Sequence, residues 1–382
     1  MTKTSPVLIS NGYEQSIQYS LSKDFIVYAE DDGVVSEVDN DAGIAIITYK
    51  NGKSQAIDFN PRVVKNSSSG FYLSNKLNYD LKKGQKVKKN EILAYENRFF
   101  TDDKINGNRF NIGSLQKVAL NSSYSTFEDS TLITQKMAKD MSTNIIMMKD
   151  VIIGKNANVT HMVKVGDHVD VGDILINYES SYDDEDINSF LASIGDELQE
   201  DIVSLTHVPI KSEYSGIITD IKIYTDSEVE DMSPSLKKIV SSYFNKNKKK
   251  RAILNKYDKS PGVIKCGILA NDPVGPIKPD KHDKIKGRVL HDSVLIEFYI
   301  SYDDVMGIGD KITFFSALKC IIGEVIEEGY EPYSEYRPDE EISTFLGARS
   351  VNARMTPSVI LTMFGNKVLV ELKRHLKQIY ES

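Results

Sequence analysis

Short runs of β-branched and aromatic residues alternate with polar turn residues in the N-terminal part of the chain. Phe25–Ala29, Gly33–Val38 and Ile44–Tyr49 are such runs. The turns at Asp31–Gly33 and Asn51–Gly52 suit hairpins, because Asn and Gly tolerate positive φ. This pattern predicts a β meander rather than alternating βαβ units.

A phrase of the form Gly-x-x-Val-x-x-x-x-x-Leu occurs twice, at Gly84–Leu93 and at Gly166–Leu175. Each copy predicts two strands joined by a tight turn. Carrier domains for biotin or lipoate have a similar pattern, so a carrier is one alternative function. Such domains present their lysine at a hairpin apex, commonly between methionines. The nearest approach here is Met147–Asp150, which lies in an apolar, strand-like run and is better interpreted as core.

Helical periodicity marks several later segments. Asp129 is positioned to cap a helix through Ser130–Met141. A second helix is predicted over Asp184–Ile202, whose apolar face opposes an acidic face that makes DNA contact there unfavourable. A third is predicted over Ser233–Leu254, and the last helix begins at Thr356–Pro357, a cap followed by proline at the first helical position.

Between the last two predicted helices the chain changes character twice. Gly262–Pro279 is punctuated by Gly and Pro and predicts a loop excursion. Ser293–Ile300 alternates enough to predict a strand, which the turn at Gly307–Lys311 closes.

Composition sets limits on the class of protein. The 382 residues are 40% hydrophobic and 27% charged, and the formal net charge is -8. No run approaches the roughly 18 apolar residues of a membrane helix, and the N-terminus lacks the apolar core of a signal peptide, so we expect a soluble, cytosolic protein. Cys266 and Cys320 are too few for a zinc cluster and are expected in the core. The net charge allows a basic channel on an acidic body.

Permanently cationic side chains stand out in two places. The turn Gly307–Lys311, with Lys319 and Arg354 beyond it, has the residue types that hold phosphates, because Arg forks onto phosphate oxygens and Lys supplies a point charge. The second place is a basic run at the end of the third predicted helix. It is interpreted either as a solvated helix end or as a contact for nucleic acid or a partner, and its cations are Lys246, Lys248, Lys249, Lys250 and Arg251.

Four motifs occur in the order found in the second-largest subunit of multi-subunit RNA polymerases, the bacterial β subunit. They are Phe127–Ile133 (FEDSTLI), Gly309–Lys311 (GDK), Lys319 and Ser350–Met355 (SVNARM). The family writes them as Phe-Glu-Asp-Ser/Ala followed by two hydrophobic residues, Gly-Asp-Lys, the lysine of Gly-Asn-Lys-Gly, and Val-Pro-Ser-Arg-Met. The spacing between the two lysines matches the family's. The chain therefore resembles this subunit.

The resemblance extends over nearly the whole chain, with departures. Pro6–Glu14 and Asn111–Ala119 resemble stretches that precede the Glu-Asp phrase, and Gly166–Leu175 and Val208–Thr225 resemble the family's flap. The residues around the second lysine and before Arg-Met differ from the family's, which puts the exact contact of the second lysine in doubt. The chain also lacks the family's N-terminal lobes and C-terminal segment. It looks like the C-terminal part of a split, divergent β subunit, as in the polymerases of large (jumbo) bacteriophages.

This resemblance implies a mainly β fold with α-helices (α+β). Its centre is a double-psi β-barrel that is interrupted by a flap-like (wall) insertion and followed by a C-terminal helix. The implied segments are a β-rich, hybrid-binding and barrel-flanking region at 1–110, the first part of the barrel at 111–154, the insertion at 155–286, the second part of the barrel at 287–358 and the helix at 359–382.

The resemblance also implies roles for single residues. Lys311 and Lys319 would hold phosphates of the RNA 3′ end or of the initiating nucleotide, and Arg354 would neutralise the incoming nucleoside triphosphate. Glu128 and Asp129 would lie near the second metal and the triphosphate. Mg²⁺ is the implied cofactor, held mainly by a partner. The family carries its Asn-Ala-Asp-Phe-Asp-Gly-Asp motif on the other large subunit, and this sequence contains nothing like it. The chain alone is expected to be inactive, and none of its residues is assigned as a metal ligand.

The implied partners are a β N-terminal fragment, β′-like fragments and an initiation (promoter-specificity) factor, together with DNA template, RNA and NTP, without a membrane. The basic run in the flap is a candidate for the factor or nucleic-acid contact. The implied location is the cytoplasm of a host bacterium, and packaging in the virion stays open. The alternatives to a polymerase subunit are a non-catalytic barrel scaffold or promoter-recognition subunit and, less favoured, the carrier.

Overall fold

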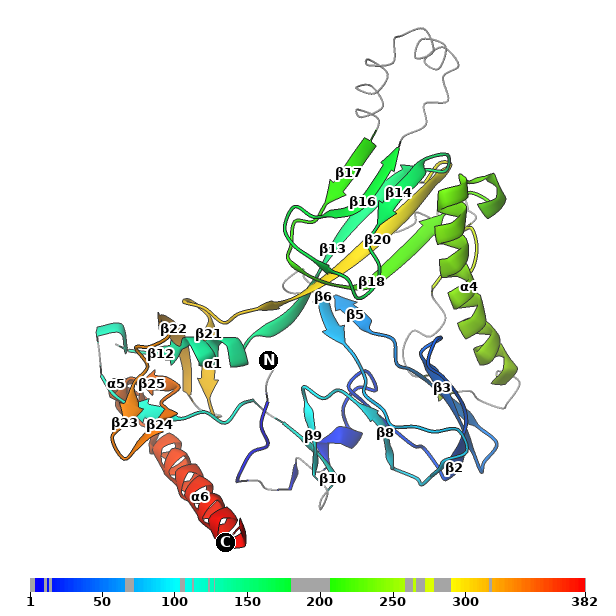
Figure 1. The fold of residues 1–382 in the computed structure, drawn as a ribbon. Helices are drawn as coiled ribbons and strands as arrows, with labels where there is room; N and C mark the ends of the chain where they lie inside the picture. Colours follow the sequence, from blue (N-terminus) through cyan, green and yellow to red (C-terminus); the bar gives the residue numbers. More distant parts are fainter. Residues whose placement is uncertain are drawn as a thin grey trace, which may run out of the picture. The chain divides into compact units, whose positions relative to one another are not determined.

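A computed structural model describes residues 4–381, except 10–11, 14–15, 66–71, 104–106, 112, 123, 127, 180–206, 258–263, 266–271, 278–289 and 316–317 (Figure 1). The chain divides into two compact units. Unit 1 comprises Met1–Leu21, Asn97–Asn144 and Asp303–Ser382, and unit 2 comprises Ser22–Glu96 and Ile145–Tyr302. The fold is mainly β with a few helices, as the sequence predicts at this level.

The N-terminal part of unit 2 is the predicted β meander. Its sheet has the order β19-β4-β3-β2-β7, and the β2–β3 and β3–β4 pairs are antiparallel hairpins. Gly52 has φ 81° in the β3–β4 turn, which explains why Asn-Gly stands there. The strands of this sheet are β2 (Gly33–Asp39), β3 (Ile44–Tyr49), β4 (Ser54–Asp58), β7 (Lys86–Val87) and β19 (Ile264–Lys265), and a separate antiparallel pair is formed by β1 (Ile26–Tyr28) and β8 (Ile92–Tyr95).

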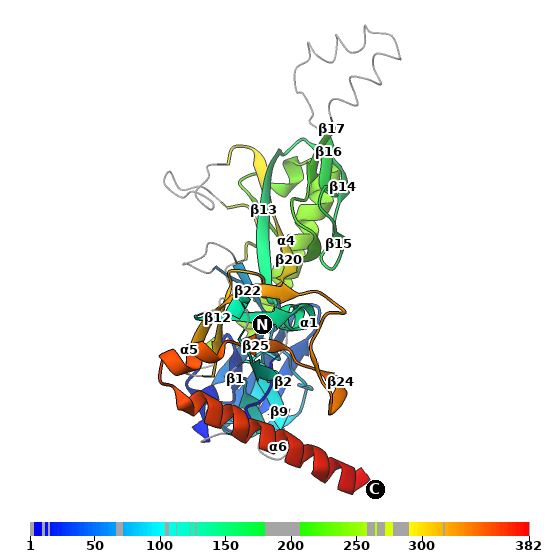
Figure 2. The same cartoon turned by 90° about the vertical axis from the view of Figure 1, so that its left-hand side faces the viewer.

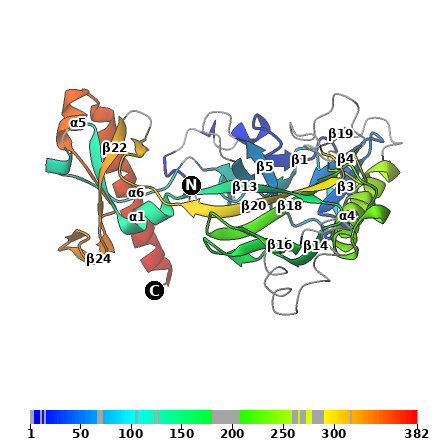
Figure 3. The same ribbon diagram turned by 90° about the horizontal axis from the view of Figure 1, so that it is seen from above.

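The rest of unit 2 is built around two long strands, β13 (Thr143–Gly154) and β20 (Ser293–Asp304), which are paired in a six-stranded sheet of order β15-β18-β20-β13-β6-β5 (Figure 3). The first nine residues of β20 are buried without alternation, which is typical of a strand covered on both faces. The other strands here are β5 (Arg62–Lys65), β6 (Tyr72–Asn75), β15 (His168–Val169) and β18 (Gly216–Thr225), with β14 (Asn158–Met162), β16 (Ile174–Glu179) and β17 (His207–Lys211) in a three-stranded sheet.

Helix α4 (Pro234–Tyr257) contributes the apolar face that covers this core, and its Leu236, Val240 and Phe244 are buried. Ser233 caps it, because its hydroxyl accepts a hydrogen bond from the Leu236 N–H at 3.3 Å. The predicted helix is therefore confirmed. The short 3-10 helix η4 (Val229–Asp231) precedes it.

Unit 1 contains a five-stranded sheet of order β11-β25-β12-β22-β21 that joins distant parts of the sequence. Within it β11 runs parallel to β25, and β12 runs parallel to β22. The elements of unit 1 are η2 (Ile17–Tyr19), β9 (Phe100–Asp103), β10 (Gly107–Phe110), β11 (Val118–Leu120), η3 (Tyr124–Thr126), β12 (Ser130–Thr134), α1 (Gln135–Asp140), β21 (Lys311–Phe314), β22 (Leu318–Ile326), β23 (Tyr333–Ser334), β24 (Arg337–Glu341), β25 (Thr344–Leu346), α5 (Ala348–Ala353) and α6 (Pro357–Glu381).

The predicted helix at Ser130–Met141 is wrong in its first half. Ser130–Thr134 forms the central strand β12, and the helix α1 starts only at Gln135. Thr134 caps it, because its hydroxyl accepts the Met137 N–H at 3.2 Å. Thr131, Leu132 and Ile133 are all buried, and two of them are β-branched. Pairing with β22 on one side and β25 on the other therefore makes this segment a strand, although its apolar residues also partly fit helical spacing.

The two repeated phrases form strand–turn–strand units, as predicted. Gly84 and Gly166 have φ of 86° and 99°, and each lies just before a short strand, β7 or β15. The lysine considered for a carrier does not lie at a hairpin apex. Lys149 lies inside β13 and forms an ion pair with Glu213.

Several predictions concern residues that the structure covers partly or not at all. The acidic helix at Asp184–Ile202 lies outside the described residues. Of the loop excursion Gly262–Pro279, only β19 and 272–277 are described. The residues of the predicted insertion, 155–286, belong with those of the N-terminal meander in unit 2. The boundaries between the two units fall at 21/22, 96/97, 144/145 and 302/303.

Candidate phosphate site

The two predicted lysines lie on one hairpin. β21 and β22 pair antiparallel with Lys311 opposite Ile321 and Thr313 opposite Lys319. Burial alternates along both strands: Ile312 and Cys320 are buried, whereas the two lysines are exposed. Because successive side chains of a strand point to opposite faces, Lys311 and Lys319 share the outer face of the hairpin.

The turn before Lys311 is built by its own sequence. Gly309 has φ 93°, and its N–H donates to the Ile322 carbonyl at 2.9 Å. The Asp310 carboxylate accepts the Gly307 N–H at 2.8 Å, and the Asp310 carbonyl accepts the Ile322 N–H at 2.9 Å. The Gly-Asp-Lys phrase therefore fixes the point at which β21 begins, with Lys311 as its first residue.

Arg354 and Asp129 are 225 positions apart and form a two-point ion pair. Arg354 Nε donates to Asp129 Oδ1 at 2.9 Å, and Arg354 Nη2 donates to Asp129 Oδ2. Both side chains are partly exposed. The fork geometry is specific to arginine, because a lysine offers a single point charge.

The backbone holds Asp129 in an uncommon conformation, with φ 57°. Its N–H donates to the buried Ser350 hydroxyl at 3.0 Å, and its carbonyl accepts the Ile321 N–H at 2.8 Å. The Glu-Asp phrase is thus tied directly to β22 and to α5, the helix that ends just before Arg354. Asp129 does not cap a helix, which corrects the prediction from the sequence.

Close packing sets the position of α5. Gly347 lies immediately before the helix, and a Cβ added there would come within 2.2 Å of the Thr126 carbonyl oxygen. Any other residue would have to shift η3 or α5. Thr126 ends η3, two residues before Glu128, so this contact helps to keep the two motifs in register.

The ion pair shifts the pKa values of its own groups, and burial shifts that of a neighbouring thiol. The Arg354 guanidinium, through its hydrogen bonds and its charge, lowers the pKa of the Asp129 carboxyl. Burial, with a smaller effect of the Asp129 charge, raises the pKa of the nearby Cys320 thiol to about 11. Cys320 is therefore a protonated core residue near neutral pH rather than a nucleophile, as predicted. Glu128, next to Asp129, is exposed, and Phe127 lies outside the described residues.

We expect replacement of Arg354 by Gln to raise the pKa of the Asp129 carboxyl toward its ordinary value. The lowered pKa means that the pair stabilises the folded chain above that ordinary value and that this contribution disappears as the pH falls through the lowered one. An NMR titration of the carboxyl carbon measures both variants, with Lys373→Gln as a control that leaves the titration unchanged. An unaltered midpoint in Arg354→Gln would show that the pair does not persist in solution.

Part of the basic run on α4 forms ion pairs and hydrogen bonds with other residues of unit 2. Lys250 is almost fully buried and pairs with the buried Asp58 at 2.6 Å. Lys249 reaches Asp39 at 3.2 Å, and Arg251 donates to the carbonyl of Asp272 at 3.2 Å. The interpretation as a solvated helix end is therefore wrong for Lys250. The other cations of the run, Lys246 and Lys248, are exposed, and contact with a factor or nucleic acid stays a prediction.

Replacement of Lys250 by Ala should strongly destabilise unit 2. It leaves the Asp58 carboxylate buried without its partner, a loss that typically costs about 3–5 kcal/mol. Lys248→Ala, on the same helix but exposed, should change the free energy of unfolding by less than about 0.5 kcal/mol. Urea unfolding of both variants measures the difference. Equal effects would mean that the buried pair contributes little.

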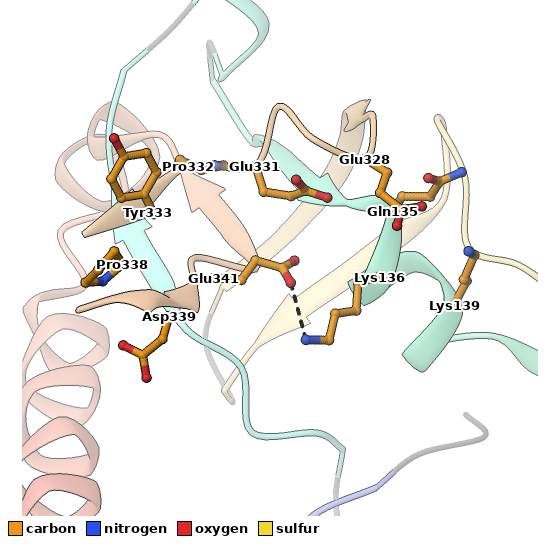
Figure 4. Close-up of a pocket in the computed structure, with 10 residues that line it drawn as sticks. All are labelled: Gln135, Lys136, Lys139, Glu328, Glu331, Pro332, Tyr333, Pro338, Asp339 and Glu341. Atoms are coloured by element: carbon orange, nitrogen blue, oxygen red, sulfur yellow. Dashed lines mark ion pairs between the residues drawn. The ribbon is translucent and has the colours of Figure 1, made fainter. Parts of the chain in front are cut away.

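A hollow of about 560 Å³ lies between α1 and the β23–β24 hairpin of unit 1 (Figure 4). Lys136 reaches Glu341 across it at 3.4 Å, and the other Glu341 oxygen is buried and has no hydrogen-bond partner among the described residues. None of the predicted site residues lines it. Reasoning from the sequence missed this hairpin, although the density of Glu, Tyr and Pro in 327–341 was a visible signal. The lining residues are Gln135, Lys136, Lys139, Glu328, Glu331, Pro332, Tyr333, Pro338, Asp339 and Glu341.

The structure thus brings together Asp129 and Arg354 as a pair and Lys311 and Lys319 as neighbours on a hairpin, and β22 contacts both sets through its backbone. Among the described residues, no group of three or more His, Cys, Asp or Glu side chains is arranged to hold a metal ion. In the same part of the chain, no helix has the length and hydropathy needed to cross a bilayer. The sequence matches no protein-family model and no curated protein.

Proposed function

We propose that the chain is the C-terminal part of a split β-like subunit of a DNA-directed, multi-subunit RNA polymerase. The observation that carries this proposal is the Arg354–Asp129 pair. Two motifs that a polymerase subunit would need side by side, although distant in sequence, form a direct contact. The strand that carries Lys319 is bonded to the same aspartate through the Ile321 N–H.

In this proposal the cations position phosphates. Lys311 and Lys319 project from one face of a rigid hairpin and hold phosphates of the RNA 3′ end or the initiating nucleotide. Arg354 has five N–H donors, of which Nε and one on Nη2 bind Asp129, so Nη1 is left for the triphosphate. Asp129 then acts as a positioning residue that aims the guanidinium. Such electrostatic positioning suits phosphoryl and nucleotidyl transfer.

Mg²⁺ is assigned to a partner. Both carboxylate oxygens of Asp129 are engaged by Arg354, which leaves the exposed Glu128 as the adjacent carboxylate. This donor set does not hold a divalent ion by itself, because Mg²⁺ sites need several oxygens in octahedral geometry. When bound, the metal supplies Lewis-acid activation of the reacting phosphate. The chain's own residues supply cations and shape, and activity requires β′-like fragments.

The finer architecture belongs to the same proposal. A double-psi β-barrel assembled from 111–154 and 287–358 is supported by the parallel pairs β11–β25 and β12–β22, each of which joins one of these segments to the other. The flap-like insertion would correspond to the residues of unit 2 between β13 and β20. An initiation factor, DNA template and RNA would be its ligands.

A scaffold or promoter-recognition subunit is the second candidate. The observation that favours it is that Asp129 already occupies the Arg354 fork, as a purely structural pair would. This reading predicts that loss of the three cations leaves transcription intact. The carrier is disfavoured by the place of Lys149 inside β13, and an unmodified intact mass after expression with a biotin or lipoate ligase would remove it.

The test of the proposed function is co-purification of the tagged chain from the cells in which it functions. We expect a partner that carries the Asn-Ala-Asp-Phe-Asp-Gly-Asp motif and RNA synthesis by the complex. A stable complex without that motif and without nucleotide addition would refute the polymerase assignment.

A further inference from the structure

Helix α6 presents a long apolar face that the described part of the chain leaves largely exposed. Thr356 and Pro357 start it as predicted, although the Thr356 hydroxyl makes no hydrogen bond, and Val359 is its buried residue. The sequence places apolar residues at helical spacing along it, among them Phe364, Val368, Leu372 and Ile379. Most of these side chains are exposed to solvent, and the red helix extends past the β23–β24 hairpin (Figures 1 and 2).

The exposed residues follow helical spacing. Positions three or four apart lie on the same side of a helix with 3.6 residues per turn, so they form one continuous stripe over the length of α6. A soluble chain rarely exposes an apolar patch of this extent without a partner. The apolar stripe consists of Leu361 (71% exposed), Phe364 (69%), Val368 (49%), Leu372 (51%), Leu376 (57%) and Ile379 (59%).

The chain already places one aliphatic side chain beside this stripe. A Cβ added at Gly365 would lie 3.3 Å from Ile9 Cδ1, so the N-terminal segment packs where the helix has no side chain. Ile9 is itself 48% exposed and extends the apolar surface. The small residue leaves room for the Ile9 side chain, and the stripe continues beyond it.

The polar edges of the stripe carry excess positive charge. On one side, an ion-pair network joins α6 to β24 and to Lys117. Among the described residues, its ion pairs join four cations, Lys117, Arg337, Lys367 and Arg374, to two carboxylates, Glu340 and Glu371, and the charge of Asp339 also acts on Lys117. Burial, and to a smaller extent the charges of Lys367 and Arg337, lowers the pKa of Lys117, while the charges of Glu371 and Asp339 act in the opposite direction. On the other side of the stripe, Lys373 is exposed.

We propose that the apolar stripe of α6 is a docking site for an amphipathic helix of a partner chain whose apolar face is flanked by acidic residues. The stripe supplies the buried contact, and the cationic edges select the sign of the flanking charges. A second copy of α6 fits less well, because its own edges would place cation against cation. The proposal does not depend on the polymerase assignment.

The test uses the full chain and two synthetic helical peptides with the same leucine stripe, one with Glu and one with Lys at the flanking positions. Fluorescence anisotropy should show at least tenfold tighter binding of the Glu peptide. Lys373→Glu should reduce this preference several-fold, whereas Lys377→Glu, on the opposite side of the helix, should leave it unchanged. The paired substitution Val368→Ser and Leu372→Ser affects exposed positions and should abolish binding.

Three results would overturn the proposal. One is equal affinity for the two peptides. Another is no binding of either peptide to a chain whose circular dichroism shows α6 folded. The third is concentration-dependent self-association that Val368→Ser with Leu372→Ser removes, because a second copy would then be the occupant.

Discussion

In the proposed polymerase, replacing both Lys311 and Lys319 with Ala should lower nucleotide addition by the assembled complex roughly 10²-fold or more, the size of effect seen when a group that stabilises transition-state charge is removed. The two side chains are exposed on the outer face of the β21–β22 hairpin, so their removal deletes charge without opening the core. Assembly with the partner chains should be unchanged. Single-nucleotide extension of an RNA primer measures the effect.

A matched control is available on α4. Lys237→Ala with Lys238→Ala removes the same charge from two exposed positions of a helix outside the candidate site and should leave extension unaltered. Higher salt should lower the extension rate of the wild type toward that of the Lys311/Lys319 variant, because salt screens the attraction between exposed cations and phosphates. Normal extension by the Lys311/Lys319 variant would favour the scaffold alternative.

Elements with local signals were predictable from the sequence. The Asn51–Gly52 hairpin, the Ser233–Pro234 start of α4 and the Gly309–Lys311 turn each depend on neighbouring residues, through positive φ, a cap or an Asp side chain that closes its own turn. Burial alternation along β21 and β22 also follows from their residue pattern. These are contacts that a short window of sequence contains.

Elements set by distant contacts were not predictable. From the sequence alone, Ser130–Thr134 is predicted as the start of a helix. It forms a strand because β22 and β25, which are distant in sequence, pair with it on either side. From the sequence alone, Lys250 is expected at the surface. Its burial depends on the ion pair with Asp58, which comes from another part of unit 2. For α6, the helical periodicity of the sequence shows which face is apolar, but it does not show what covers that face.

The candidate site contains one feature that the sequence predicts and one that it does not. The motif order pointed to Asp129 and Arg354, whereas the form of their contact, a fork that uses both carboxylate oxygens, required the structure. The fork is the observation behind the proposal that Asp129 orients an arginine, whereas its expected place near the metal stays a prediction.

In the proposed polymerase, replacing Arg354 with Lys should lower kcat/KM for the incoming nucleotide nearly as much as Arg354→Ala, by roughly 10-fold to 10²-fold, although the charge is kept. A lysine cannot hold both Asp129 oxygens and still offer a donor to the triphosphate, whereas the guanidinium can. Asp129→Asn, which keeps one acceptor for the fork, should mainly raise KM and have a smaller effect on kcat. Single-turnover extension over a range of NTP concentrations separates the two parameters. Full activity in Arg354→Lys would mean that the triphosphate requires only a positive charge at this position. The contact with Asp129 would then stabilise the fold rather than orient the arginine.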